Sequence, residues 1–191
     1  MSPKRTLRDD RLIDALEALP RSSFEGTVWR VVREGRDPTQ CSASGGRWDD
    51  GTFDVLYTSM ERDGALAEMY FHLLRGQPVF PSKTRYALHE LRVSLKEAIA
   101  FPSLKDLEAV GLDTSTYGQL LYAERQLEYP RTQEIAEVAY FLGCDGILVP
   151  SARMSCSNVV LFCQMIGSDS VEIIEDHGLI DWPAWAKGRK L

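Results

Sequence analysis

Hydrophobic residues recur at helical spacing along residues 62–75. They fall at positions i, i+3, i+4, i+7 and i+8, which is typical of a helix that buries one face. These residues are Leu66, Met69, Tyr70, Leu73 and Leu74. The opposite face carries Glu68, His72 and Arg75. We therefore expect a helix that packs on the core through one stripe and presents a carboxylate and an imidazole on its other side.

Three other stretches are also expected to be helical: residues 6–19, 103–110 and 132–142. Pro20 ends the first of them, because proline lacks a backbone donor and clashes inside a helix. Gly111 closes the second. Thr132 is the expected N-cap of the third, and Gly143 is its expected C-terminal residue. Residues 112–130 show no clear periodicity and predict no particular element.

Alternation of apolar and polar residues predicts strands elsewhere in the chain. The segment GTVWRVV, residues 26–32, is rich in β-branched residues and places Val28, Arg30 and Val32 on one side. An irregular loop follows, over residues 34–51. The other expected strands are residues 53–59, 85–93, 146–150, 158–165 and 171–176.

Helices and strands alternate along the chain without a regular βαβ rhythm, which predicts an α+β fold. The length of 191 residues is that of one domain and is enough to bury a sizeable core. The final segment, DWPAWAKGRKL, is expected either to be exposed or to dock through its two tryptophans. The sequence therefore predicts a single mixed α/β domain.

The composition is ordinary for a soluble globular protein, with 44% hydrophobic and 26% charged residues. The formal net charge is −6 and the chain has no block of basic residues. Affinity for nucleic acid comes mostly from lysine and arginine contacts to phosphates. A nucleic-acid binder is therefore disfavoured, although a local basic cluster can still bind one small anion.

No stretch reaches the roughly 18 apolar residues that a membrane span requires. The first nineteen residues have scattered charges and no apolar core of the kind found in signal peptides. We therefore expect a cytoplasmic protein. Its four cysteines, at positions 41, 144, 156 and 163, include no C-x-x-C pair, so a zinc site is disfavoured and reduced, mostly buried thiols are expected.

Four arginines lie close together in this acidic chain: Arg30, Arg33, Arg36 and Arg47. Arginine presents five donors in a rigid fork that suits phosphate or carboxylate. For Arg33 and Arg36 we expect ordinary pairing with nearby acidic residues, which are Glu34, Asp37, Asp49 and Asp50. Arg30 differs because it lies within an alternating strand, where an unpaired charge is costly. A functional role and a structural one are both open for Arg30.

The segment SGGRW, residues 44–48, matches neither the G-x-x-x-x-G-K-[ST] phosphate loop nor G-x-G-x-x-G. Its adjacent glycines nevertheless permit unusual backbone angles and close approach of a ligand. The strand that follows places Tyr57 and Ser59 on one face. This region therefore brings a guanidinium and a phenol to the ends of neighbouring elements.

Glu68 and His72 lie one turn apart on the polar face of their helix, where they can share a cleft or simply form an i,i+4 pair. The sequence specifies no Ser/His/Asp triad. Asp49 or Asp50 together with Glu68 could supply the paired carboxylates of a glycosidase, but sequence spacing does not fix the separation that this mechanism needs.

A second unusual stretch is DGILVPSARMSCSNVVLF, in which Pro150 and Ser151 end one strand and Asn158 begins the next. Small polar residues fill the connection. Sites are often built at strand ends and in their loops. From this stretch alone, an ordinary connection is the simpler interpretation.

Together these segments resemble the RES domain family, named for an arginine, a glutamate and a serine. The matching blocks occur in the family's order and cover most of residues 26–163. They are VWRVV around Arg30, GGRWDDGTFDVLYTS through Arg47 and Tyr57, ALAEMYFHL around Glu68, and LGCDGILVPSARMSCSNVVLF around Ser151. One departure is Asp49, where relatives commonly carry asparagine.

The resemblance implies a split-sheet fold like that of ADP-ribosyltransferases. It implies the toxin of a bacterial toxin–antitoxin pair that consumes NAD as substrate, with no metal required. The implied partner is an Xre-type helix-turn-helix antitoxin that blocks the active site. Residues 26–166 would form the NAD-binding catalytic domain, after an N-terminal helical extension (1–25) and before a C-terminal strand and tail (167–191) packed on the same domain.

The resemblance also implies site residues, carried over by matching motif. The catalytic residues would be Glu68, Arg30 and Ser151. The NAD-binding residues would be Arg30, Arg47, Tyr57, Ser59 and Asn158. The two arginines would hold the pyrophosphate or its riboses, and the tyrosine would stack on the nicotinamide or the adjacent ribose. Glu68 would accept a ribose hydroxyl and stabilise an oxocarbenium-like transition state, while Ser151 would orient the nicotinamide-side ribose.

Two enzymatic versions share cleavage of the nicotinamide–ribose bond and differ in the acceptor of ADP-ribose. The acceptor is water or phosphate in one version and a cellular protein in the other. A third alternative is a non-catalytic protein-interaction module that retains the fold. The sequence does not choose among them.

Overall fold

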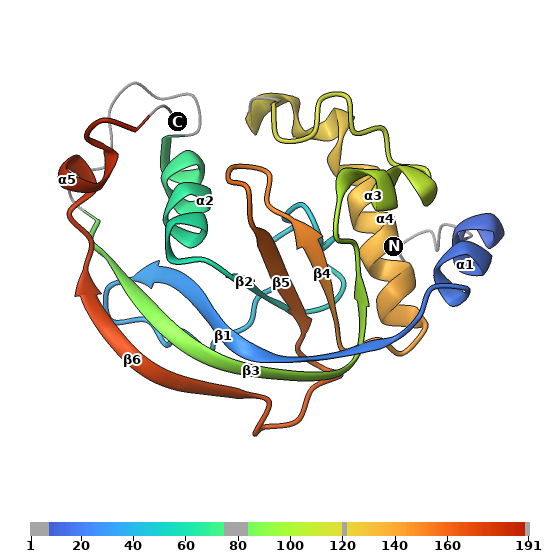
Figure 1. Cartoon of the computed structure of the whole chain (residues 1–191), viewed down its shortest axis with the longest axis horizontal. Helices are drawn as coiled ribbons and strands as arrows, with labels where there is room; N and C mark the ends of the chain where they lie inside the picture. Colours follow the sequence, from blue (N-terminus) through green and yellow to red (C-terminus); the bar gives the residue numbers. More distant parts are fainter. Residues whose placement is uncertain (1–7, 75–83, 120–121, 190–191) are drawn as a thin grey trace, which may run out of the picture.

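The computed structural model describes residues 8–74, 84–119 and 122–189 (Figure 1). Its elements are α1 (Asp10–Glu17), β1 (Ser22–Arg33), β2 (Val55–Ser59), α2 (Arg62–Leu74), β3 (Tyr86–Ala100), α3 (Leu104–Ala109), the 3-10 helix η1 (Tyr122–Leu127), α4 (Tyr129–Phe141), β4 (Gly146–Pro150), β5 (Ser157–Phe162), β6 (Val171–Leu179) and α5 (Trp182–Ala186). The expected single mixed α+β domain is confirmed. None of the helices described is long and apolar enough to cross a bilayer.

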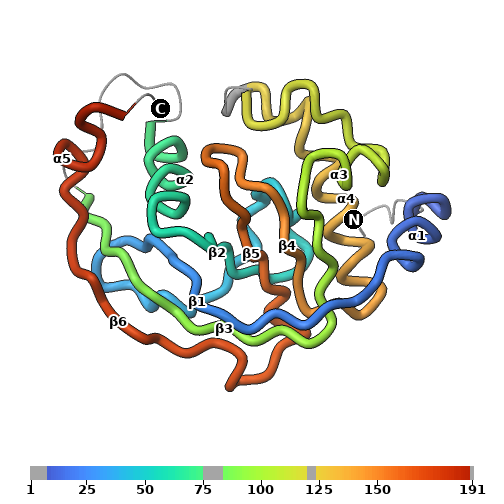
Figure 2. Tube along the Cα trace, in the orientation of Figure 1, coloured from blue at the N-terminus to red at the C-terminus, as the bar shows by residue number. Residues whose placement is uncertain are grey.

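Six strands form one sheet in the order β1-β2-β5-β4-β3-β6, and β1 also pairs with β3. The long strand β3 gives one edge to β1. Its other edge is divided, since β6 pairs with residues 87–93 and β4 pairs with residues 98–100. This division separates a β1–β3–β6 layer from a β2–β5–β4 layer, and Figures 1 and 2 show the two layers crossing.

The β2–β5–β4 layer is apolar on both faces, and each face supplies a different core. On β5, Val159 and Leu161 face the core between the two layers. Val160 and Phe162 point the other way, into the core formed with α1, α3 and α4. Alternation along the strand therefore lets one short segment join two cores.

A third apolar cluster holds α2 and α5 against β1 and β3. Leu66 is almost fully buried there, and Met69, Tyr70 and Leu73 pack around it, which confirms the predicted stripe of α2. Trp182 of α5 is buried in the same cluster. The C-terminal segment therefore docks through its tryptophans, which was one of its two predicted alternatives.

The start of α4 differs from the prediction. The helix begins at Tyr129, with Glu128 as the N-cap residue and Pro130 in the first turn. Thr132 is buried inside the helix, where its hydroxyl donates to the Tyr129 carbonyl at 3.0 Å. The prediction of Thr132 as N-cap is wrong, because proline favours the first helical position and moves the start of the helix toward the N-terminus.

Other element bounds shift at their ends. The first helix begins at Asp10, because Asp9 caps it by accepting from the Arg11 amide at 3.0 Å. Strands β1 and β3 are longer than predicted, and β5 ends at Phe162. The expected helical residues 6 and 7 and the expected position of Arg75 lie outside the described residues.

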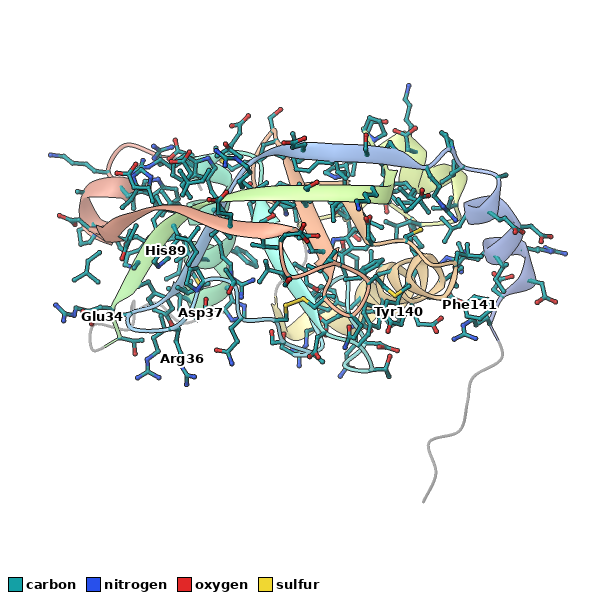
Figure 3. All side chains as sticks on the ribbon, turned by 90° about the horizontal axis from the view of Figure 1, so that it is seen from below. Glu34, Arg36, Asp37, His89, Tyr140 and Phe141 are labelled. Carbon is teal, nitrogen blue, oxygen red and sulfur yellow. A yellow bond between two sulfur atoms is a disulfide. The ribbon has the colours of Figure 1, made fainter. Side chains whose placement is uncertain are left out.

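The expectation of four reduced cysteines is wrong. Cys41 and Cys163 form a disulfide, visible as the yellow bond in Figure 3, and their Cα atoms are 6.4 Å apart. Cys144 and Cys156 are free thiols. The bonded residues are 122 positions apart in sequence, so only the tertiary structure brings them together. The disulfide ties the loop between β1 and β2 to the end of β5.

Reduction of this disulfide is expected to lower the free energy of unfolding by about 2–4 kcal/mol, because the cross-link restricts the unfolded chain. The measurement is urea unfolding of the wild type and of the Cys41→Ser/Cys163→Ser variant, each with and without dithiothreitol. The reductant should lower the midpoint of the wild type and leave that of the variant unchanged. Cys156→Ser keeps the disulfide and should respond like the wild type. A wild-type midpoint that does not change on reduction would contradict the prediction.

Candidate active site

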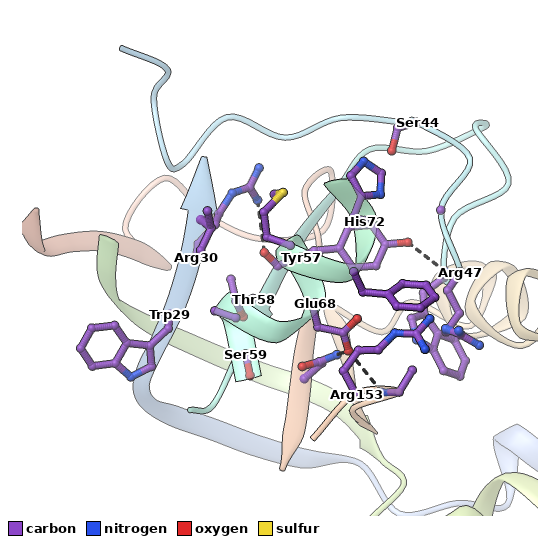
Figure 4. A pocket seen from close by; sticks show the side chains of 18 of the residues that line it. Trp29, Arg30, Ser44, Arg47, Tyr57, Thr58, Ser59, Glu68, His72 and Arg153 are labelled. Atoms are coloured by element: carbon purple, nitrogen blue, oxygen red, sulfur yellow. Dashed lines mark hydrogen bonds between the residues drawn. The ribbon is translucent and has the colours of Figure 1, made fainter. Parts of the chain in front are cut away.

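A cavity of about 330 Å³ opens beside β1, β2 and α2 (Figure 4). This volume is within the range of about 300–1,000 Å³ typical of small-molecule sites. Six of the residues predicted from the sequence line it: Arg30, Arg47, Tyr57, Ser59, Glu68 and Asn158. Ser151, the seventh, is not part of the lining and instead contacts Glu68. The structure therefore brings all seven residues to one place.

Three donors hold one oxygen of the Glu68 carboxylate. Its Oε1 accepts from the Ser151 hydroxyl at 2.7 Å, from the Asn158 side-chain amide at 3.0 Å and from the Ala152 backbone amide at 3.2 Å. All hydrogen bonds to Glu68 among the described residues end on this atom. These bonds fix the orientation of the carboxylate, so Oε2 is the oxygen that can act on a ligand.

Ser151 also organises the turn between β4 and β5. Its Oγ accepts from the amides of Arg153 and Met154, at 3.1 and 3.3 Å, while its hydroxyl donates to Glu68. One side chain thus shapes the turn and anchors the carboxylate. Ser151 is placed to position Glu68.

The first turn of α2 packs tightly against the strand ends, which places Glu68 one turn further along. A Cβ on Gly64 would lie 2.6 Å from the Cys156 sulfur and would also collide with the Ser59 hydroxyl. Ser59 Oγ in turn lies 3.6 Å from Cys156 Sγ. Glycine is therefore required at position 64 by close packing. Ser59 supports this junction at the edge of the cavity.

Arg30 projects from β1 into the cavity wall. Its guanidinium donates to the Gln40 carbonyl at 3.0 Å and to the Tyr57 carbonyl at 3.5 Å. Burial lowers the pKa of Arg30 to about 10, and the negative charge of Asp37 opposes that shift. The side chain is a partly buried cation whose hydrogen bonds among the described residues go only to neutral carbonyls.

Arg47, unlike Arg30, has both a carboxylate partner and aromatic rings around its guanidinium. It forms an ion pair with the buried carboxylate of Glu128, and its Cζ lies 4.8 Å from the centre of the Tyr117 ring and 5.1 Å from that of Tyr129. Burial acts to lower the pKa of Arg47, but the electrostatic influence of Tyr117 and Glu128 outweighs it, so the pKa is raised. Tyr117 and Tyr129, which come from a stretch without a sequence pattern, thus line the cavity.

The backbone amides of the two glycines before Arg47 donate hydrogen bonds to Asp49, which is fully buried. Asp49 Oδ1 accepts from the Gly45 amide at 2.6 Å, and Oδ2 accepts from the Gly46 amide at 2.8 Å and from the Tyr57 hydroxyl at 2.9 Å. Burial and the charge of Asp49 raise the pKa of Tyr57 well above its usual value. The Tyr57 hydroxyl therefore stays protonated and donates.

Gly46 is required there for a steric reason as well, because an added Cβ would lie 2.6 Å from the Tyr57 hydroxyl. Gly45 adopts φ +71°, a left-handed angle that favours glycine. In this chain both carboxylate oxygens of Asp49 accept hydrogen bonds. An asparagine at this position could accept only through one of them.

The expected pairing of Arg33 and Arg36 with nearby acids is not observed. Glu34 pairs with Arg85 at 2.7 Å, and Asp49 is used as described above. Figure 3 shows Glu34 and Arg36 at the same end of the molecule. Both arginines are exposed, and neither lines the cavity.

Sequence reasoning missed several cavity residues. Arg153 lies with its Cζ 3.2 Å from the centre of the Phe71 ring, and it donates to the Gly118 carbonyl. Tyr117 and Tyr129 complete the aromatic lining. The only sequence signal for Arg153 was its place between two serines in the segment SARMS. No short-range pattern connects this segment with the elements that carry Tyr117 and Tyr129. Glu68 and His72 both line the cavity, with His72 exposed at its edge.

One group of potential metal ligands occurs among the described residues, on β3 and β6. It consists of Glu90, Glu175 and His177, whose ligand atoms lie within 4.8 Å of one another. His177 Nε2 is 3.1 Å from Glu90 Oε2. None of the three lines the cavity.

The cavity therefore combines a fixed carboxylate, partly buried guanidinium groups and aromatic rings. The guanidinium groups can bind anionic oxygens, and the rings can stack on a planar group. The carboxylate can stabilise positive charge that develops on a ligand. This set suits an anionic ligand that carries a flat ring and becomes cationic at one carbon.

Two comparisons relate this chain to known proteins. The RES domain matches residues 27–183. Among solved structures, the chain is similar to one in the crystal structure of the M. tuberculosis MbcT–MbcA toxin–antitoxin complex, with a TM-score of 0.76, 19% sequence identity and coverage of 93% of this chain and 96% of that chain. At that identity the likeness shows a shared fold. No curated protein matches the sequence.

Asp49→Asn is expected to lower the free energy of unfolding by about 1–3 kcal/mol, because the new amide nitrogen would face a buried donor. The control is Asp50→Asn. Asp50 is exposed and accepts from Thr52 through Oδ1, which asparagine can still do, so its effect should stay within about 0.5 kcal/mol. Urea unfolding compares the two variants, and equal stability would count against the proposed role of the carboxylate.

Proposed function

The chain belongs to the RES domain family, and from that premise we propose that it is the toxin of a toxin–antitoxin pair that cleaves the nicotinamide–ribose bond of NAD. The observation that carries the proposal is the Glu68 carboxylate, fixed by three donors at a cavity with buried arginines and aromatic rings. We assign the catalytic domain to residues 26–166, which contain every residue that lines the cavity.

NAD offers the groups that the cavity can bind. Its pyrophosphate is anionic and suits buried guanidinium groups such as that of Arg30. Its nicotinamide ring is planar and suits stacking on an aromatic side chain, for which Tyr57 is the candidate. The Tyr57 hydroxyl is already bonded to Asp49 and to the Trp48 amide, so the ring is held in a fixed orientation.

Glu68 supplies the catalytic charge. As nicotinamide leaves, C1′ of the ribose acquires positive charge, and a carboxylate held in place beforehand stabilises that charge without reorganising. Its Oε2 also accepts a ribose hydroxyl. Ser151 and Asn158 act through Glu68, because their hydrogen bonds hold Oε1 and leave the other oxygen facing the ligand.

The acceptor of ADP-ribose is water, phosphate or a side chain of a cellular protein. The partner is an antitoxin of the Xre helix-turn-helix type that blocks the cavity. The similar fold from the MbcT–MbcA complex supports assembly with an antitoxin.

A non-catalytic interaction module is the alternative. It predicts that the protein neither binds NAD nor releases nicotinamide. The fixed carboxylate favours the enzyme, since a module that only binds a protein has no need of a carboxylate held by three donors at a cavity.

Glu68→Gln is expected to reduce nicotinamide release at least about 100-fold. Glutamine keeps an oxygen for the three donors at Oε1 and removes the charge, so folding and much of the NAD affinity should survive. The assay follows nicotinamide release by purified protein, with and without phosphate and with a cell lysate. Release that needs the lysate, with label on one protein band, would identify a protein acceptor.

The matched variant for this assay is Ser151→Ala, which removes one donor to Glu68 and retains the carboxylate. Its rate should fall by less than that of Glu68→Gln. Wild-type turnover by Glu68→Gln would rule out the assigned role of Glu68. No release and no NAD binding by the wild type would favour the interaction module.

Arg30→Ala is expected to weaken NAD affinity by about 10- to 100-fold, because it removes a buried donor to an anionic ligand. Calorimetry with NAD, or with ADP-ribose where turnover interferes, gives the affinity. Arg33→Ala, a change at an exposed arginine of the same strand, is the control and should bind like the wild type. Unchanged affinity of Arg30→Ala would exclude this contact.

A further inference from the structure

The three arginines that line the cavity differ in how their charges are compensated. Arg47 has a carboxylate partner, Glu128. Neither Arg30 nor Arg153 takes part in any ion pair found within the described residues, and each donates to backbone carbonyls. A partly buried cation without a carboxylate partner attracts an anionic ligand more strongly than one that is already paired. Two arginines, Arg30 and Arg153, therefore have charge available for a ligand.

Arg153 is held rigidly in place. Its backbone amide donates to Ser151 Oγ at 3.1 Å, and its guanidinium lies on the Phe71 ring and donates to the Gly118 carbonyl. Gly118 has φ +73° and packs so closely on Ala152 that it has no space for a Cβ. The side chain is therefore fixed before a ligand arrives, which reduces the entropy lost on binding.

Arg153 also has an unused donor. Its Nε is buried and has no hydrogen-bond partner among the described residues. This atom has almost no accessible surface, so a ligand would meet the other guanidinium nitrogens, of which only Nη1 donates within the described residues, to the Gly118 carbonyl. Burial lowers the pKa of Arg153, and the charge of Glu68 opposes that shift. Arg153 and Glu68 line the same cavity, and in the view of Figure 4 the Arg153 side chain extends from beside Glu68 toward Arg47.

We propose that Arg153 binds the pyrophosphate of the dinucleotide beside Glu68, together with Arg30, and that Arg47 mainly shapes the cavity through Glu128, Tyr117 and Tyr129. This assignment rests on the proposed function and adds a substrate-binding residue to it. The phosphate on the ribose that reacts at Glu68 is the natural partner of Arg153, because both groups lie at the same end of the ligand.

The test compares Arg153→Met, Arg153→Lys and the wild type in equilibrium binding of ADP-ribose, a probe without a nicotinamide–ribose bond to cleave. Methionine retains packing on Phe71 and removes the charge. Its affinity for ADP-ribose should fall about 10- to 100-fold, and binding should depend less on salt than in the wild type. Lysine should recover the salt dependence and part of the affinity. Arg36→Met, the same change at an exposed site, should bind like the wild type.

Nicotinamide, which carries no phosphate, separates charge recognition from a structural role. Its binding to Arg153→Met, followed by ligand-observed NMR, should stay within about twofold of the wild type. Loss of nicotinamide and ADP-ribose binding together would assign Arg153 a structural role and overturn the proposal. An Arg153→Met variant that binds ADP-ribose with the affinity and salt dependence of the wild type would also overturn the proposal. In either case, nicotinamide release by the wild type would leave the proposed function standing. A wild-type protein that neither binds ADP-ribose nor releases nicotinamide would overturn both.

Discussion

The hydrogen bonds to Glu68 Oε1 are the interaction on which the rest of the site depends. They join a helix, the start of β5 and the turn after β4, because the carboxylate belongs to α2 and its donors belong to the other two elements. A carboxylate on a helix surface would ordinarily be solvated and mobile. Here three donors hold it, so its charge is available in one orientation.

Gly64 allows this convergence, since the first turn of α2 could not otherwise approach Ser59 and Cys156. The split of the sheet at β3 provides the space for α2, because the β2–β5–β4 layer turns away from the β1–β3–β6 layer. The fixed Glu68 carboxylate, the strand ends and the cavity are therefore consequences of one packing arrangement.

An acidic chain with net charge −6 concentrates buried positive charge at this cavity. Arg47 is balanced by Glu128, which lies 81 residues away in sequence, while Arg30 and Arg153 donate to carbonyls. The loop that carries Arg47 is fixed by Asp49 and by the Cys41–Cys163 disulfide. Because these side chains are held in place before a ligand arrives, an anionic ligand would lose little entropy in ordering them.

The sequence by itself determined the elements whose burial repeats regularly. The stripe of α2 and the glycine after α4 follow from local geometry, and the ordered motifs indicated Arg30, Arg47, Glu68 and Ser151. Only the tertiary structure decided the disulfide, the Arg47–Glu128 pair, the aromatic wall from residues 112–130 and the place of Arg153. These depend on contacts between residues far apart in the chain, and local periodicity carries no information about such contacts.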